Sequence, residues 1–406
     1  MALRIADPEL FGVTESSFTL TFSVEDAAGP VAAPAHLKVD GERRAVSEGP
    51  AGTRQLRVEG LAPGTAHRIE IETPGGEPAR RDPFFAGTVT TLPAPRAPQV
   101  GSFATLNDLH FGEPMFGGVL LESGDMLDQP GAAVVRETDT EVPYWRFMNE
   151  DSISEINQLA VDLAVIKGDI ADVGRTDQFE AAARAFAGFR MPHHAFLGNH
   201  DYYGLLAGEE VDGYALLGQP RAPRSLELGG WRLVLLETAH PGEHHGVFAN
   251  DRLRWLAAEL EETRERGVPT LLLMHHHPVP PEHADSYPNT IGINPLHSLR
   301  LFALIGRHPQ VKGVLIGHTH RNRVRRYPAA GATPFIEVNC SKDYPGGWAH
   351  YRLFEDGSFR QEVRRTGSAR ALEHSTRCRD LFGGGYRRFA LGVLDTRSFV
   401  AGGAAA

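Results

Sequence analysis

Five short motifs in this 406-residue chain combine carboxylate, imidazole and amide side chains. They are, in chain order, Asp108-Leu109-His110, Gly168-Asp169-Ile170-Ala171-Asp172, Gly198-Asn199-His200-Asp201, Met274-His275-His276-His277-Pro278 and Gly317-His318-Thr319-His320. Carboxylates, amide oxygens and imidazoles suit Fe, Mn or Zn, and one carboxylate can bridge two ions about 3.5–4 Å apart. Each motif alone is weak, because a lone histidine at a strand end is more often structural, but all five in this order predict a metal centre.

Sulfur ligands are not expected in this centre. The two cysteines, Cys340 and Cys378, do not form a Cys-x-x-Cys pair. This argues against both a disulfide framework and a thiolate zinc site. Any metal must therefore bind to oxygen and imidazole nitrogen.

The motifs need strands that end at a common edge. Apolar runs that read as buried strands occur at residues 163–166, 195–197, 233–236, 271–274, 314–316 and 335–338. Between them, Phe179, Ala183 and Phe186 have helical spacing. This alternation predicts an α/β domain, which we assign to residues 100–365, and such domains place ligands in the loops that follow their strands.

The first 92 residues have a different pattern. Phe18, Leu20, Phe22 and Val24 alternate with polar residues, as a half-buried strand requires. Turn residues recur without a helical stretch, so we predict a small all-β sandwich over residues 1–92, and its 61–65 turn resembles a fibronectin type III domain. Prolines make residues 93–99 a stiff linker, and residues 366–406 form a C-terminal extension.

In order and spacing, the five motifs resemble the calcineurin-like metallophosphoesterases over about residues 100–340. The resemblance implies a four-layer α/β/β/α catalytic domain that binds two metal ions, Mn, Fe or Zn. One ion would bind Asp108, His110, Asp169 and His320, and the second would bind Asp169 as a bridge, Asn199, His275 and His318. A hydroxide that bridges the ions would attack the phosphoester.

The same resemblance gives catalytic roles to two more residues. His200 follows the ligand Asn199 and would be the general acid that protonates the leaving group. Asp172, three residues after the bridging Asp169, would orient His200.

The run of three histidines leaves one ligand ambiguous. The ligand that directly follows the apolar strand is His275, whereas counting back from Pro278 selects His276. We favour His275 and keep His276 as the alternative.

Two features of the sequence indicate which branch of this superfamily the chain resembles most. Purple acid phosphatases also carry a fibronectin-like domain, but Asp172 stands where their pattern has the tyrosine that ligates ferric iron. The run at 275–280, with residues 291–294, resembles the bacterial cyclic-nucleotide and glycerophospho-diesterase branch. We therefore predict a phosphodiesterase whose selectivity lies in residues 111–155 and in the segment after Pro278. The alternatives are a phosphomonoesterase without the tyrosine and a non-catalytic scaffold, which the intact motifs disfavour.

The charge and hydropathy of the chain limit its partners. A net charge of -10 repels long polyanions, so a small phosphoester is expected rather than a long nucleic acid. The four arginines within residues 321–326 are a candidate local patch for a phosphate, an acidic neighbour or solvent. No apolar run reaches the roughly 18 residues that span a bilayer, and no secretory signal is visible, so we expect a cytoplasmic protein. The oligomeric state stays open.

Overall fold

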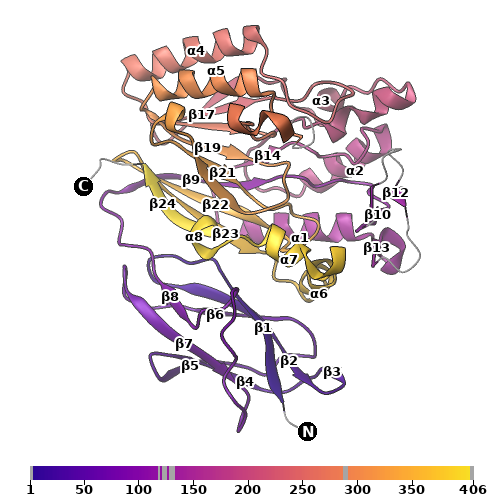
Figure 1. Cartoon of the computed structure of the whole chain (residues 1–406), viewed down its shortest axis with the longest axis vertical. Coiled ribbons are helices and arrows are strands. Elements are labelled where there is room, and N and C mark those ends of the chain that lie inside the picture. Colours follow the sequence, from indigo (N-terminus) through magenta and orange to yellow (C-terminus); the bar gives the residue numbers. More distant parts are fainter. Residues whose placement is uncertain (1–2, 118, 121–125, 128–132, 287–290, 403–406) are drawn as a thin grey trace.

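The computed structural model describes residues 3–117, 119–120, 126–127, 133–286 and 291–402. Figure 1 shows an all-β unit that contains the N-terminus, next to a larger unit of strands and helices. Parts of the two segments predicted to set selectivity, residues 111–155 and those after Pro278, lie outside the described residues.

The N-terminal unit is built from antiparallel strands alone. They are β1 (Arg4–Phe11), β2 (Phe18–Asp26), β3 (Gly29–Pro30), β4 (Ala35–Val39), β5 (Glu42–Ser47), β6 (Arg54–Val58), β7 (Ala66–Glu72) and β8 (Thr88–Thr90). One sheet has the order β1-β2-β3 with β6 paired to β2, and the other has the order β5-β4-β7-β8. Phe18, Leu20 and Phe22 of β2 pack with Leu37 and Ile71 in one core, so the two sheets face each other. The all-β N-terminal region predicted from alternation is confirmed.

The larger unit contains two six-stranded mixed sheets. The first has the order β15 (His193–Phe196), β14 (Leu163–Lys167), β9 (Gln99–Leu106), β22 (Gly347–Phe354), β23 (Ser358–Arg365) and β24 (Ser398–Gly402). The second has the order β16 (Arg224–Leu228), β17 (Trp231–Leu236), β18 (Thr270–Met274), β19 (Val311–Ile316), β21 (Pro334–Glu337) and β20 (Arg323–Arg326). Strands β15, β14 and β9 are parallel, as are β17, β18, β19 and β21. The predicted α/β class is confirmed.

Side chains that alternate along β17 show how the layers pack. Leu233 and Leu235 lie in the same core as Phe103 of β9, whereas Val234 and Leu236 lie in a second core with helix residues. Because successive side chains point to opposite faces of a strand, this sheet is covered on both faces. Helices α4 (Asn250–Glu265) and α5 (Pro295–Gly306) cover the outer face. Helices α1 (Tyr144–Gln158) and α2 (Thr176–Phe186) pack into the core that contains the first sheet.

The remaining elements include one helix of 11 residues, α6, and several shorter elements. They are β10 (Met115–Phe116), β11 (Val119–Leu120), β12 (Met126–Leu127), β13 (Val135–Arg136), α3 (Gly213–Leu216), α6 (Ala369–Arg379), α7 (Tyr386–Ala390), α8 (Leu394–Arg397) and 3₁₀ turns at Glu137–Asp139, His200–Ala207, Pro281–Ser286, Pro328–Ala330 and Phe382–Gly384. Each helix within the described ranges is too short or too polar to span a bilayer.

The segment after residue 365 belongs to the larger unit. Strand β24 pairs with β23 at the edge of the first sheet, with Ser398 opposite Glu362. Helix α6 contacts α1 and α7. The C-terminal extension therefore completes a sheet whose other strands come from residues 99–365.

A cluster of buried charges joins the two units. Glu9 of β1 is 1% exposed and accepts hydrogen bonds from the Tyr344 hydroxyl at 2.7 Å, Arg387 Nε at 2.7 Å and Arg365 at 3.2 Å. Arg365 also donates to the Thr21 hydroxyl at 3.2 Å, on the polar face of β2. Strand β2 was predicted to be half-buried, but this contact helps to bury its polar face as well.

Substitution of Glu9 tests this interface. Glu9→Gln keeps the side-chain volume but leaves Arg365 and Arg387 without their shared carboxylate, and breaking a buried ion pair costs about 3–5 kcal/mol. We expect the free energy of unfolding in urea, followed by circular dichroism, to fall by about that amount. The control Glu150→Gln removes an exposed ion pair with Arg146 and should change stability by about 0.5 kcal/mol or less. Equal effects of the two substitutions would contradict the assigned role of Glu9.

Candidate metal centre

The five motifs lie in loops that begin where β9, β14, β15, β18 and β19 end. Five of the predicted ligands have a positive φ, namely Asp108 at 54°, His110 at 44°, Asp169 at 50°, His318 at 68° and His320 at 51°. Non-glycine residues rarely adopt this conformation, and it persists where the surrounding structure enforces it, which is most often at functional sites. The backbone is thus held in a strained form where the ligand candidates converge.

Two motif glycines make room for these side chains. A Cβ atom on Gly198 would lie 2.3 Å from Asp169 Oδ1, and one on Gly168 would lie 2.6 Å from His275 Nδ1. Both distances are far below van der Waals contact, so any larger residue would displace Asp169 or His275. The glycines in these motifs therefore allow the backbone to approach the site closely.

The first group of donors contains Asp108, His110 and His320, with Asp169 beside it. His110 Nε2 lies 3.3 Å from His320 Nε2 and 3.9 Å from Asp169 Oδ2. His320 Nε2 lies 3.6 Å from Asp108 Oδ1. These are the four residues predicted to hold one metal ion, and the structure brings them together.

The second group surrounds His275. Its Nε2 atom lies 3.1 Å from Asp169 Oδ2, 3.2 Å from Asn199 Oδ1 and 3.2 Å from His318 Nδ1. The amide nitrogen of Asn199 donates to the Tyr203 hydroxyl at 2.5 Å, which leaves Oδ1 for the site. The four residues predicted to hold the second ion also converge, and Asp169 stands between the two groups.

The donor set fits metal ions by its chemistry. Imidazole nitrogens, carboxylates and an amide oxygen, all of which can ligate a metal ion, face one another at distances between 3.1 and 3.9 Å. Asp108 and Asp169 are 0% and 1% exposed, and burying a carboxylate without a cation is costly. Burial raises the pKa of Asp108. Burial also opposes the charge of Asp169, but the imidazoles of His275 and His200 outweigh it and hold that pKa well below its usual range.

The two candidate histidines after β18 have different surroundings. His275 Nδ1 donates to the Lys167 carbonyl at 2.8 Å, so Nε2 is the ring nitrogen that faces the other donors. His276 Nδ1 lies 2.9 Å from the Thr238 hydroxyl, and its buried Nε2 has no hydrogen-bond partner among the described residues. The His276 ring is tilted by 47° to the His318 ring, with 4.5 Å between their centroids. Ligand atoms of His275, His276 and His318 all lie within 4.8 Å of one another, so both histidines are candidates by position.

His200 contacts the main chain of Asp172 more closely than its carboxylate. His200 Nδ1 donates to the main-chain carbonyl of Asp172 at 2.6 Å, while the Asp172 carboxylate is 3.9 Å away. That carboxylate lies closer to His110, at 3.4 Å from Nδ1. Burial raises the pKa of Asp172 to about 6. The main chain at Asp172 thus orients His200, and its side chain faces a predicted metal ligand.

The sequence motifs missed one acidic residue that contacts the centre. The buried Asp343 carboxylate accepts a hydrogen bond from His320 Nδ1 at 3.0 Å and from the Tyr386 hydroxyl at 2.8 Å. Lys342 lies 3.2 Å from the same carboxylate. A carboxylate behind a ligating histidine fixes its tautomer and orientation. The available signal was the position of Asp343 soon after the apolar run at 335–338.

Asp201 connects two of the motifs. Its carboxylate accepts main-chain N–H bonds from Ile170 at 2.9 Å, Ala171 at 2.7 Å and Gly198 at 2.8 Å. Burial, with the nearby charge of Asp169, raises its pKa to about 7. Asp201 therefore locks the loop after β14 against the loop after β15.

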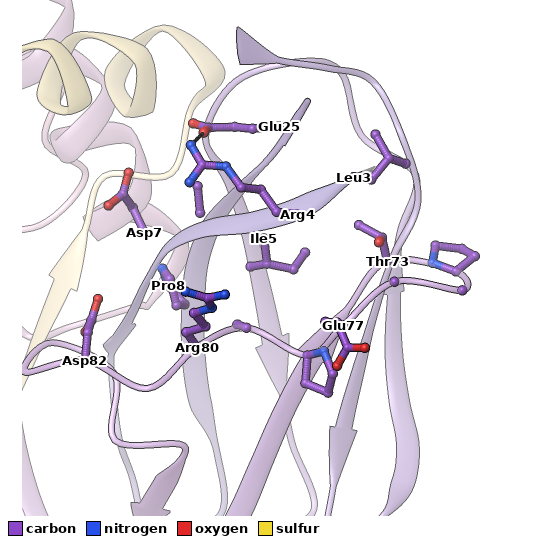
Figure 2. A pocket seen from close by; sticks show the side chains of 16 residues that line it. Leu3, Arg4, Ile5, Asp7, Pro8, Glu25, Thr73, Glu77, Arg80 and Asp82 are labelled. Carbon is purple, nitrogen blue, oxygen red and sulfur yellow. Dashed lines mark hydrogen bonds and ion pairs between the residues drawn. The ribbon is translucent and has the colours of Figure 1, made fainter. Parts of the chain in front are cut away.

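A separate pocket lies in the N-terminal unit. It has a volume of about 840 Å³ and lies beside β1, where Arg4 pairs with Glu25 at 2.7 Å (Figure 2). Its lining includes Asp7, Thr73 and Arg80 but none of the motif residues. The motif residues therefore lie outside this pocket.

Comparison with known proteins agrees with the motifs. The sequence pattern of the family described as calcineurin-like phosphoesterase matches residues 102–322. The 3',5'-cyclic adenosine monophosphate phosphodiesterase CpdA of Escherichia coli K12 is 30% identical over 230 residues, which are 53% of this chain and 78% of that protein. A probable cyclic nucleotide phosphodiesterase of Synechococcus sp. is 28% identical over 221 residues, or 51% of this chain and 78% of that protein.

A third relative has a different substrate in its name. The glycerophosphodiester phosphodiesterase GpdQ of Enterobacter lignolyticus is 28% identical over 186 residues, which cover 45% of this chain and 65% of that protein. The family match spans more than half of the chain and contains all five motifs from Asp108 to His320. The chain therefore belongs to the calcineurin-like phosphoesterase family and is a metal-dependent phosphoester hydrolase, as the motifs predicted.

Proposed function

We propose that this protein hydrolyses small phosphodiesters, such as cyclic nucleotides or glycerophosphodiesters, at a centre of two metal ions. The observation that carries the proposal is the convergence of two donor groups on Asp169, whose Oδ2 lies 3.1 Å from His275 and 3.9 Å from His110. The relatives named as cyclic nucleotide and glycerophosphodiester phosphodiesterases support diesters as the substrate class.

Each ion would have its own set of side chains. One would bind Asp108, His110, Asp169 and His320, and the other Asp169, Asn199, His275 and His318. When bound, such ions act as Lewis acids on phosphoryl oxygens and lower the pKa of a coordinated water. Asp343 would hold His320 in the tautomer whose Nε2 faces the ion, because His320 Nδ1 donates to Asp343.

His200 would protonate the leaving oxygen. Its Nδ1 donates to the Asp172 carbonyl at 2.6 Å, which leaves Nε2 as the nitrogen that can carry a proton to the substrate. Its main-chain N–H donates to Asp169 Oδ1 at 3.0 Å, and its ring lies edge-on to His110 at 4.4 Å between centroids. These contacts fix the imidazole beside the ligand candidates.

Substrate preference tests the reaction type. We expect metal-free protein reconstituted with Mn, Fe or Zn to hydrolyse bis(p-nitrophenyl) phosphate faster than p-nitrophenyl phosphate, and to cleave cyclic AMP. The readout is kcat/KM for each ester with each metal, with the metal-free protein as the control. A preference for the monoester would favour a phosphomonoesterase that lacks the tyrosine of purple acid phosphatases. No turnover with any metal would favour a scaffold.

Two substitutions separate metal binding from proton transfer. Asp169→Asn removes the charge shared by both groups, so we expect loss of bound metal by elemental analysis and loss of turnover. His200→Ala should retain metal and lower kcat by about 10²–10⁴-fold, with the largest effect on substrates with poor leaving groups. Equal metal loss in the two variants would contradict these roles.

A matched pair of substitutions tests whether His275 or His276 is the metal ligand. His275→Ala removes a donor that faces three others, so we expect metal affinity, measured by titration of the apoprotein, to fall by more than about 100-fold, beyond the loss typical of a residue behind a ligand. His276→Ala leaves a buried gap of similar size and should retain near wild-type affinity. The reverse order would assign the ligand to His276.

A further inference from the structure

A positively charged cleft adjoins the candidate metal centre. It has a volume of about 500 Å³, and its lining includes His318, Arg321, Arg323, Arg325 and Phe389. Because His318 belongs to both the cleft and the second donor group, a ligand in the cleft would be adjacent to a phosphoester at the metal centre. The three arginines come from β20 and the turn before it, and Phe389 comes from α7.

One buried carboxylate partly neutralises these arginines. Glu337 of β21 is 0% exposed and lies opposite Arg323 in the sheet. Arg323 binds it through two nitrogens, at 2.9 and 2.8 Å, and the Thr319 hydroxyl donates to it at 2.8 Å. Arg325 lies 3.0 Å from the same carboxylate, and Arg321 is farther away at 3.4 Å. Arg323 and Thr319 thus satisfy much of the bonding capacity of Glu337.

The cleft retains an excess of positive charge. Three guanidinium groups face one carboxylate, and no acidic residue is found among the described residues that line the cleft. Burial opposes the charge of Glu337, but Arg325 and the other arginines outweigh it and lower its pKa to about 2, so it contributes one negative charge. The side chains of Arg321, Arg323 and Arg325 remain 24%, 30% and 22% exposed. Part of each guanidinium side chain is therefore accessible to an anion in the cleft.

We propose that this arginine cleft binds a second phosphate group of the substrate, so that, among small phosphodiesters, those that carry a further phosphate are hydrolysed more efficiently than simple cyclic nucleotides or glycerophosphodiesters. The inference rests on the proposed phosphodiesterase function and specifies its substrate class. Guanidinium groups bind phosphate through paired, charge-assisted hydrogen bonds, which gives both affinity and orientation. The side chain of Arg321 lies over the Phe389 ring at 4.8 Å, which holds its guanidinium at the cleft.

The size and charge of the patch favour a small ligand. Three arginines at one cleft can neutralise one phosphate, whereas the chain as a whole carries a net charge of -10 that repels an extended polyanion. The scissile phosphate and the second phosphate would therefore belong to one compact molecule that reaches from His318 to Arg325.

Two esters that differ only in the second phosphate test this inference. Thymidine 5'-(p-nitrophenyl phosphate) has a free 3'-hydroxyl, and its 3'-phosphorylated derivative releases the same p-nitrophenolate. With the metal-loaded full-length protein, we expect kcat/KM to be at least about tenfold higher for the 3'-phosphorylated ester, because one charge-assisted hydrogen bond is worth that factor or more. Equal kcat/KM values for the two esters would overturn the inference and leave the phosphodiesterase function intact.

Single substitutions test which arginines cause the preference for the 3'-phosphorylated ester. Arg321→Gln and Arg325→Gln should each reduce the preference for the 3'-phosphorylated ester by about tenfold. Arg323 is left in place so that Glu337 keeps its paired bonds, and thermal melting checks that each variant is folded. The control is Arg326→Gln on the same strand, because Arg326 binds the Ala332 carbonyl at 3.0 Å and is not part of the cleft.

The control also distinguishes specific binding from bulk charge. If Arg326→Gln reduces the preference as much as Arg321→Gln, the effect comes from net charge and the inference fails. If the wild-type protein turns over neither ester, the proposed phosphodiesterase function itself is overturned, and this inference with it.

Discussion

The structure of the centre depends on one constraint, which is the negative charge of Asp169. This carboxylate is almost completely buried. A buried carboxylate is stable only where cations or hydrogen-bond donors compensate for lost hydration. Here the main-chain N–H of His200 and the imidazoles of His275 and His110 surround it. Gly198 and Gly168 allow the chain to approach this closely, and Asp201 ties together the loops that carry Asp169 and His200. The strained backbone at the ligand candidates is the cost of this convergence.

The convergence of the motifs could be expected from the sequence because most of them directly follow an apolar run. The roles of Asp108, Asp169, Asn199, His275 and His318 as ligands rest on the family resemblance and remain predictions. Strand alternation likewise predicted the all-β N-terminal region. The α/β class followed from apolar runs and helical spacing.

What could not be predicted depends on contacts between distant segments. Asp343 binds His320 through a side chain that belongs to no motif, and the Asp172 contact with His200 uses a carbonyl oxygen that every residue type has. The linker at 93–99 indicated a boundary between two units, but it gave no sign that Glu9 joins them through Arg365 and Arg387. Its third partner, Tyr344, directly follows Asp343, so the N-terminal unit is connected to a residue that contacts the centre.

The strand β20 follows the last ligand motif in the chain but supplies no ligand candidate itself. Its Arg323 and Arg325 lie beside the centre and are anchored to Glu337 of the neighbouring strand. A residue such as Arg325 can therefore be exchanged without altering the groups proposed to carry out hydrolysis. Evolution or directed evolution could use this arrangement to change which molecule is recognised while inheriting the bond-breaking chemistry unchanged, which makes β20 a natural place to diversify a library of variants.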